Sequence, residues 1–151
     1  MPSIEATVES RFIAPLHLGR MVLPFRCLEP YRAIVPWDGQ KLLSGEDPDL
    51  ARYPGLEKWW RQAETLWNQH RKSKRLSLLQ RIDYQRTLRN QLPAPEHRVV
   101  YTASGTYLAA ARVVDRSAVI EHKLYWASCE SQEAALYLVA ILNAPYRQHL
   151  G

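Results

Sequence analysis

Residues 98–143 have the clearest secondary-structure pattern of the chain and read RVVYTASGTYLAAARVVDRSAVIEHKLYWASCESQEAALYLVAILN. Two β-rich runs, 99–102 and 106–114, are joined around the Ser-Gly pair at 104–105, which favours a tight turn. Apolar and polar residues then alternate over 118–126, as in a strand that has one buried face. These segments predict an antiparallel β-sheet.

A helical pattern closes the same stretch. Residues 132–143 place apolar side chains at helical spacing, and the pattern stops before Pro145. We expect this helix to pack on the sheet. The side chains that would face the sheet are Ala135, Leu138, Val139 and Leu142.

The region before residue 38 predicts only short strands. Four prolines and a glycine interrupt residues 11–36, and they confine the extended pieces to sheet edges or strand ends. The residues that favour strands here are Val22, Leu23, Phe25, Ile34 and Val35.

Residues 55–91 predict a pair of helices, which we interpret as an insertion. The first helix begins near Leu56, and the second begins at a capping box of Ser77 and Gln80 and extends to about Asn90. The first helix has one apolar stripe, which consists of Leu56, Trp59, Trp60, Ala63, Leu66, Trp67 and His70.

These elements predict an α+β fold: an antiparallel sheet with a C-terminal packing helix and a projecting basic helix pair. We expect a single, fragment-like domain over residues 1–151. No apolar run is long enough to span a bilayer, and the N-terminus is acidic and polar, unlike a secretory signal. The two cysteines, Cys27 and Cys129, lie far apart and suggest reduced thiols, so we expect a cytoplasmic protein.

The positive charge is concentrated in one part of the chain. Residues 57–89 contain nine Lys or Arg and three acidic residues, a net charge of +6, whereas the whole chain has +5. Such a segment is typical of a protein that binds a polyanionic partner. A solvated face is the competing explanation, and positive charge at a helix C-terminus is favourable in itself.

Most catalytic motifs are absent from the sequence. The six glycines are scattered, so there is no nucleotide-binding glycine loop, and there is no tight cluster of metal ligands. One pattern resembles a Mg²⁺-dependent nuclease: Asp115 followed by Glu121 and Lys123 on one face of an expected strand. Alternating polar residues produce the same pattern by chance, and we expect the neighbouring His122 to be a hydrogen-bonded core residue.

Several segments resemble a known family. Residues 98–111 (RVVYTASGTYLAAA), 119–127 (VIEHKLYWA) and 137–143 (YLVAILN) are similar to the region after the catalytic domain in large bacterial N6-adenine DNA methyltransferases. These relatives are the single-chain type II restriction-modification enzymes and their lone methyltransferase cousins. Residues 11–16 (RFIAPL) and 23–30 (LPFRCLEP) fit the same region, so the resemblance covers most of the chain.

The resemblance implies a target-recognition segment of a parent protein that binds S-adenosylmethionine and flips an adenine from DNA. This chain lacks the cofactor loop and has no Pro-Pro pair, so only the DNA-facing role carries over, with no cofactor in the chain itself. The implied partners are double-stranded DNA and a catalytic methyltransferase domain, in cis or in trans. The candidate DNA-binding residues are Arg71, Lys72, Lys74, Arg75, Arg81, Arg86, Arg89, Ser104, Thr106 and Lys123.

Two other functions stay open at this point. One is the small nuclease. The other is a protein-interaction module that docks a partner through Trp59, Trp60 and Trp67. The competing explanation for the tryptophans is that they pack the helix pair onto the sheet, which we favour.

Overall fold

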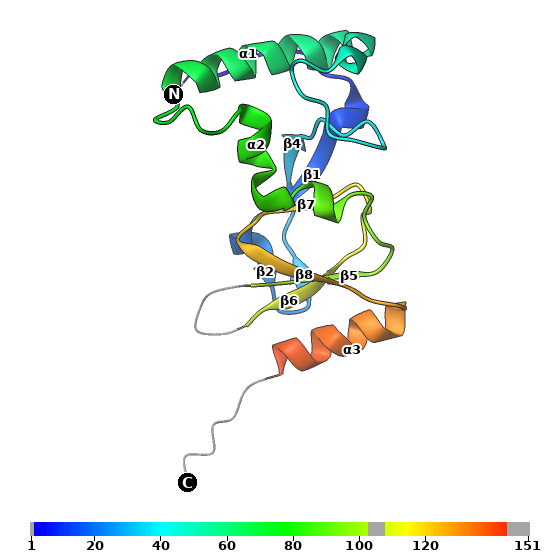
Figure 1. The fold of residues 1–151 in the computed structure, drawn as a ribbon. Helices are drawn as coiled ribbons and strands as arrows, with labels where there is room; N and C mark the ends of the chain where they lie inside the picture. The colour runs from blue at the N-terminus through cyan, green and yellow to red at the C-terminus, as the bar shows by residue number, and fades with distance from the viewer. Residues whose placement is uncertain (1, 103–107, 145–151) are drawn as a thin grey trace. The chain divides into compact units, whose positions relative to one another are not determined.

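The computed structural model describes residues 2–102 and 108–144 (Figure 1). Its contacts divide the chain into two compact units, one of Met1–Ala14 and Arg32–Pro93, the other of Pro15–Tyr31 and Ala94–Gly151. The expectation of a single domain stays a prediction, because compactness alone does not tell whether a unit folds independently.

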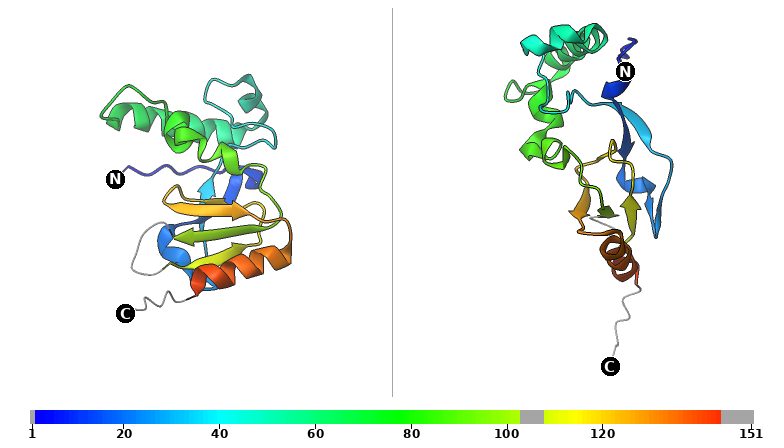
Figure 2. Two further views of the ribbon diagram at one scale, coloured as in Figure 1. Left: turned by 60° about the horizontal axis from the view of Figure 1, so that its bottom comes forward. Right: turned by 90° about the vertical axis from the view of Figure 1, so that its right-hand side faces the viewer.

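The second unit is built on an antiparallel sheet, as the sequence predicts. Its central strand is β5 (Arg98–Thr102), which pairs on one side with β6 (Ala110–Val113) and on the other with β8 (Leu124–Ser128). Helix α3 (Gln132–Asn143) lies along this sheet (Figures 1 and 2). The expected turn at 104–105 lies outside the described residues.

Both faces of this sheet are covered by apolar groups. On one face Val99 and Ala110 pack with Ala135 and Val139 of α3, and Leu138 and Leu142 lie against them, as expected. On the other face the buried side chains are Val22, Val100, Ala111, Val113, Ala118, Ile120 and Leu124. Adjacent residues of β5 therefore point to opposite cores, as the pleat of a strand requires.

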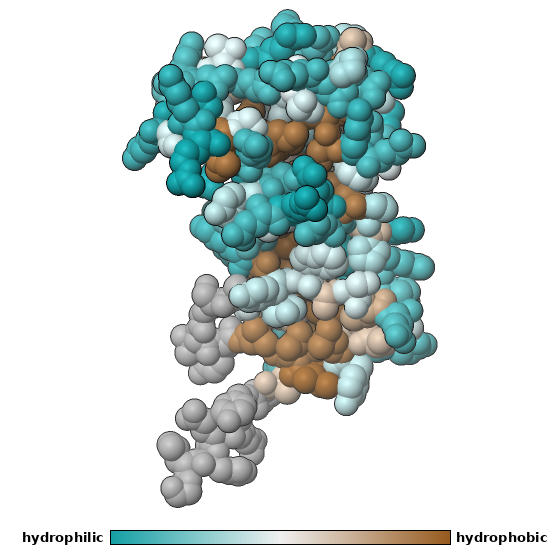
Figure 3. Space-filling model, in the orientation of Figure 1, coloured by the Kyte–Doolittle hydropathy of each residue, from teal (hydrophilic) through white to brown (hydrophobic). Residues whose placement is uncertain are grey.

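Helix α3 is also apolar on the side away from the sheet. Leu136, Tyr137 and Ile141 are 48%, 71% and 50% exposed. Apolar atoms accordingly appear on the surface over this helix (Figure 3). The described part of the chain contains no helix that is both long enough and apolar enough to cross a bilayer.

The prediction of one strand over 118–126 is wrong, because two short strands occupy this segment. β7 (Val119–Ile120) pairs in parallel with β1 (Ile13–His17), and the chain then turns at His122 and Lys123 before β8 begins. The two halves have different partners, so a continuous strand would forfeit one set of pairings. His122 is exposed in this turn, which corrects the expectation of a core histidine.

Phe25 also departs from the sequence prediction. It lies in the two-residue turn between β2 (Val22–Leu23) and β3 (Arg26–Cys27), with φ at 68°, and it is 65% exposed. Its backbone N–H donates to the Ala110 carbonyl at 2.9 Å, which ties this hairpin to β6. Because the ring of Pro24 fixes a negative φ at the first position of the turn, the positive φ falls on Phe25 at the second position, as in a type II turn, regardless of its strand preference.

The first unit contains α1 (Pro54–His70), α2 (Leu78–Ile82) and β4 (Tyr31–Ile34), whose first residue belongs to the second unit. Its hydrophobic core cluster consists of Phe12, Leu43, Leu50, Leu56 and Trp60. The predicted first helix is confirmed. Its first turn is capped from a distance, because the Glu9 carboxylate accepts the Gly55 and Leu56 backbone N–H groups at 2.9 and 2.8 Å.

The second helix starts as predicted but ends early. The capping box of Ser77 and Gln80 is present. The helix stops at Ile82, and Gln85 and Arg86 then have φ values of 54° and 62°. Short 3-10 turns at Tyr84–Arg86 and Arg89–Gln91 replace the expected continuation to Asn90. The projecting basic helix pair is therefore not observed as expected: one long helix is followed by a short one and a folded turn.

Candidate nucleic-acid interface

The loop between α1 and α2 has a defined conformation. The indole N–H of Trp67 and the guanidinium of Arg71 both donate to the Leu76 carbonyl, at 3.2 and 3.3 Å. Within the loop the Ser73 hydroxyl accepts the Arg75 backbone N–H at 3.3 Å. Side chains that project from this loop therefore start from a fixed backbone.

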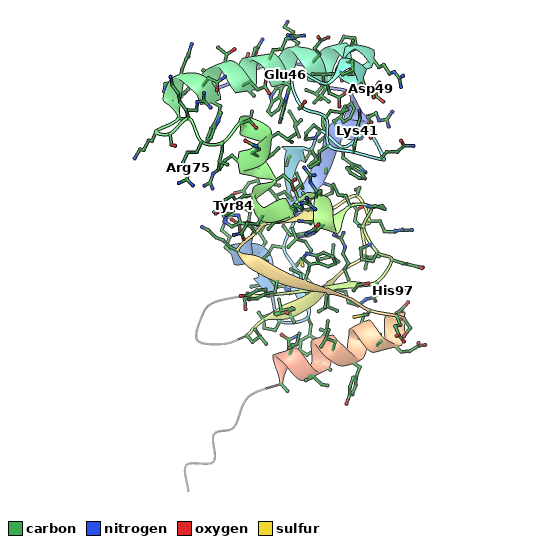
Figure 4. All side chains as sticks on the ribbon, in the orientation of Figure 1. Lys41, Glu46, Asp49, Arg75, Tyr84 and His97 are labelled. Atoms are coloured by element: carbon green, nitrogen blue, oxygen red, sulfur yellow. The ribbon has the colours of Figure 1, made fainter. Side chains whose placement is uncertain are left out.

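A groove of about 570 Å³ lies beside this loop. We call it the basic groove and define it by four cationic residues and two aromatic residues. Among the residues that the structure describes, no aspartate or glutamate lines it. The defining residues are Arg71, Lys72, Arg75 and Arg81 with Trp67 and Tyr84. Arg75 and Tyr84 lie on the same side of α2 in Figure 4.

Two carboxylates of the same segment pair with arginines that do not line this groove. Glu57 pairs with Arg61 at 2.7 Å, and Asp83 pairs with Arg89. In the part of the chain that the structure describes, Lys72, Arg75 and Arg81 form no ion pair. Their positive charge is therefore available to an external anion.

A second hollow, of about 430 Å³, adjoins the same loop. Lys74 contributes to it, but so do Glu46 and Glu64. Its charge is therefore mixed, and Arg71 and Arg75 border both hollows. The basic groove is the better site for an anion because its lining residues, among those that the structure describes, include four cations and no carboxylate.

The hydrogen bonds of Asp83 fix the position of Tyr84 at the groove. This carboxylate is 6% exposed and accepts the backbone N–H groups of Leu88 and Arg89 at 3.1 and 2.9 Å, as well as the Arg89 guanidinium. These bonds fold the chain back directly after α2. Tyr84, the next residue, is held at the groove with 49% of its surface exposed.

The other predicted DNA-binding residues do not join this groove. Arg89 is held by Asp83, and Arg86 is exposed in the turn after Tyr84 without lining the groove. Lys123 is exposed in the β7–β8 turn of the second unit. Ser104 and Thr106 lie outside the described residues.

The sequence pattern did not indicate Trp67 or Tyr84 as part of a nucleic-acid interface. The sequence pattern placed Trp67 in the apolar stripe and among the tryptophans of the protein-docking alternative, and it gave Tyr84 no role. The available signal was their interleaving with the basic residues of 67–84. Of the other two tryptophans of α1, Trp60 is 1% exposed in the core of the first unit, where it packs with Phe12, and Trp59 lies against it.

The residues of the nuclease pattern have local partners. The Asp115 carboxylate accepts the Ser117 N–H and hydroxyl at 2.8 and 2.6 Å, and Glu121 accepts the Gly19 N–H at 2.9 Å. Because Lys123 lies in a turn, it does not share a strand face with Glu121. Among residues 2–102 and 108–144, no three His, Cys, Asp or Glu side chains are grouped as metal ligands.

A buried polar cluster lies in the second unit. Arg98 is 1% exposed and donates to the Asp115 and Ala118 carbonyls at 3.0 and 2.9 Å, so it holds the turn between them. Burial lowers the pKa of Arg98, and the Asp115 carboxylate opposes this shift. Burial and the positive charge of Arg98 lower the pKa of His17, whereas the negative charge of Asp115 acts to raise it. The hydrogen bonds of this cluster support a structural role.

Comparison of the chain with protein-family models and with curated proteins gives no match in either case. The resemblance to adenine methyltransferases therefore depends on the sequence segments alone.

Proposed function

We propose that this chain binds DNA through the basic groove and its flanking loop, and that it does so without catalysing a reaction. The observation that carries the proposal is the groove itself, where four cations meet without a carboxylate. Neutralising phosphates with Lys and Arg supplies essentially all of the sequence-independent affinity in DNA binding. An ordinary solvated face intersperses both signs of charge.

The proposed biological setting comes from the resemblance. In it the chain is the target-recognition portion of a protein related to N6-adenine DNA methyltransferases, and it acts on double-stranded DNA next to a catalytic domain, in cis or in trans. S-adenosylmethionine would be bound by that other domain. The chain alone is expected neither to bind S-adenosylmethionine nor to cleave DNA with Mg²⁺, and titration calorimetry and a plasmid nicking assay test these two points.

The decisive experiment removes charge from the loop. Each phosphate contact contributes close to one unit to the slope of log K against log salt concentration. Combined Lys72→Ala, Lys74→Ala and Arg75→Ala should therefore weaken duplex binding for all sequences and flatten this slope by roughly two to three units. Fluorescence anisotropy over a salt series measures both quantities.

The matched control removes the same charge elsewhere. Arg26, Arg32 and Lys58 are exposed and do not line the basic groove. Their combined replacement by Ala should leave the salt slope near that of the unmodified chain. Equal slopes in both triple variants and the unmodified chain would refute the proposed interface.

A further inference from the structure

The basic groove has a feature that phosphate binding does not require. Beside its cations lies Tyr84, a residue that is 49% exposed although a folded chain gains by burying such a side chain. We propose that the groove accepts an unpaired nucleotide of a single strand, with its base stacked on Tyr84 and its phosphates bound by the surrounding arginines. This inference rests on the proposed function and specifies what the groove accepts beyond the phosphates of a duplex.

Hydrogen bonds within the chain fix the two aromatic residues of the groove. The Trp67 indole donates its N–H to the Leu76 carbonyl, so its polar edge is already bonded and its ring serves as a wall of the groove. Tyr84 follows Asp83, and the Tyr84 carbonyl accepts both the N–H and the hydroxyl of Thr87, at 3.1 and 2.8 Å. A ring whose backbone is fixed in this way loses little conformational entropy when a base stacks on it.

The cations suit the phosphates that flank such a base. Arg75 and Arg81 form no ion pair among the described residues, and both line the groove together with Tyr84. A guanidinium donates to phosphate oxygens in a fixed fork and also stacks on flat rings. Alternating aromatic and cationic contacts are the pattern by which proteins bind single strands without reading their sequence.

A duplex cannot use the ring in this way. Its bases are paired and stacked on one another, so it presents phosphates and base edges to a protein but not base faces. The volume of about 570 Å³ lies in the range of sites that take small organic molecules. The groove therefore gains from Tyr84 only if one base stands free of its neighbours.

The test compares three nucleic acids of equal length: an oligothymidine strand, the same strand with abasic sugars, and a duplex. Anisotropy titrations at one salt concentration should show that the intact strand binds roughly 5- to 150-fold tighter than the abasic strand, which corresponds to the contribution of one stacked base. Tyr84→Leu should abolish this preference. Tyr84→Phe should keep it, since the Tyr84 hydroxyl has no hydrogen bond in the described part of the chain. Thermal unfolding confirms that each variant folds.

The outcomes separate this inference from the proposed function. Equal binding of intact and abasic strands, or unchanged preference in Tyr84→Leu, overturns the nucleotide site. If duplex binding still depends on Lys72, Lys74 and Arg75, the proposed function survives that result. A chain that binds none of the three nucleic acids overturns both.

Discussion

Replacing Asp83 by Ala should both destabilise the first unit and disable the basic groove. The Asp83 carboxylate is buried, and it accepts the Leu88 and Arg89 N–H groups and the Arg89 guanidinium. Without it the turn after α2 has no internal acceptor for these donors. Tyr84 then loses the backbone conformation that holds it at the groove.

The expected cost follows from these contacts. A hydrogen bond to a charged group contributes about 1.5–3 kcal/mol, but Leu88 and Arg89 are partly accessible, and their N–H groups regain some bonding to water. The ion pair adds little, since the Arg89 side chain is 48% exposed. We expect Asp83→Ala to lower the free energy of unfolding by about 2–3 kcal/mol, which corresponds to roughly 4–12 °C in Tm for a chain of this size.

Urea unfolding followed by tryptophan fluorescence measures this effect, because Trp37, Trp59, Trp60 and Trp67 all belong to the first unit. Asp83→Asn is the matched variant: it keeps an oxygen for the two backbone donors and loses the ion pair, so it should cost about 1 kcal/mol or less. An Asp83→Ala protein whose stability changes by less than about 0.5 kcal/mol, or whose preference for the intact strand is retained, would refute the reasoning.

Three further predictions concern other parts of the chain. Trp60→Ala should lower the free energy of unfolding in urea by about 3–5 kcal/mol, because the side chain is 1% exposed; a loss below about 1 kcal/mol would contradict its place in the core. Asn143→Ala should lower the free energy of unfolding by about 1–3 kcal/mol and speed hydrogen exchange at Ala110, because the Asn143 side-chain amide is hydrogen-bonded to both the N–H and the carbonyl of Ala110. Unchanged exchange at Ala110 would exclude these hydrogen bonds. Because the pKa of His17 is lowered in the folded chain, the unfolded chain takes up this proton first, and stability falls as the pH decreases through about 6.5. His17→Gln should weaken this dependence in urea titrations, and an identical pH profile would count against the buried histidine.

Local patterns were enough to predict several elements of this fold. The helical spacing over 132–143 gave α3 with the correct inward face, and the capping box located the start of α2. The β-rich run at 99–102 became the central strand of the sheet. In each case the residues that determine the structure are neighbours in the sequence, so their spacing contains the information.

Tertiary contacts decided the elements that these patterns misjudged. The alternation over 118–126 is equally compatible with one strand or two, and the separate partners β1 and β5 select two. The second helix ends at Ile82, where the Asp83 carboxylate reaches forward to residues 88 and 89. A sequence pattern contains neither the choice of a distant strand partner nor the direction of a buried carboxylate.

The same distinction holds for the candidate site. Net charge already located the cations in 57–89, because charge is a property of composition. The fold decided which of these cations can bind an external anion. Arg89 forms an ion pair with Asp83, whereas Arg75 and Arg81 line a common groove. The fold also brought Trp67 and Tyr84 to that groove, since only a turn of defined geometry can place two distant rings beside the same charges.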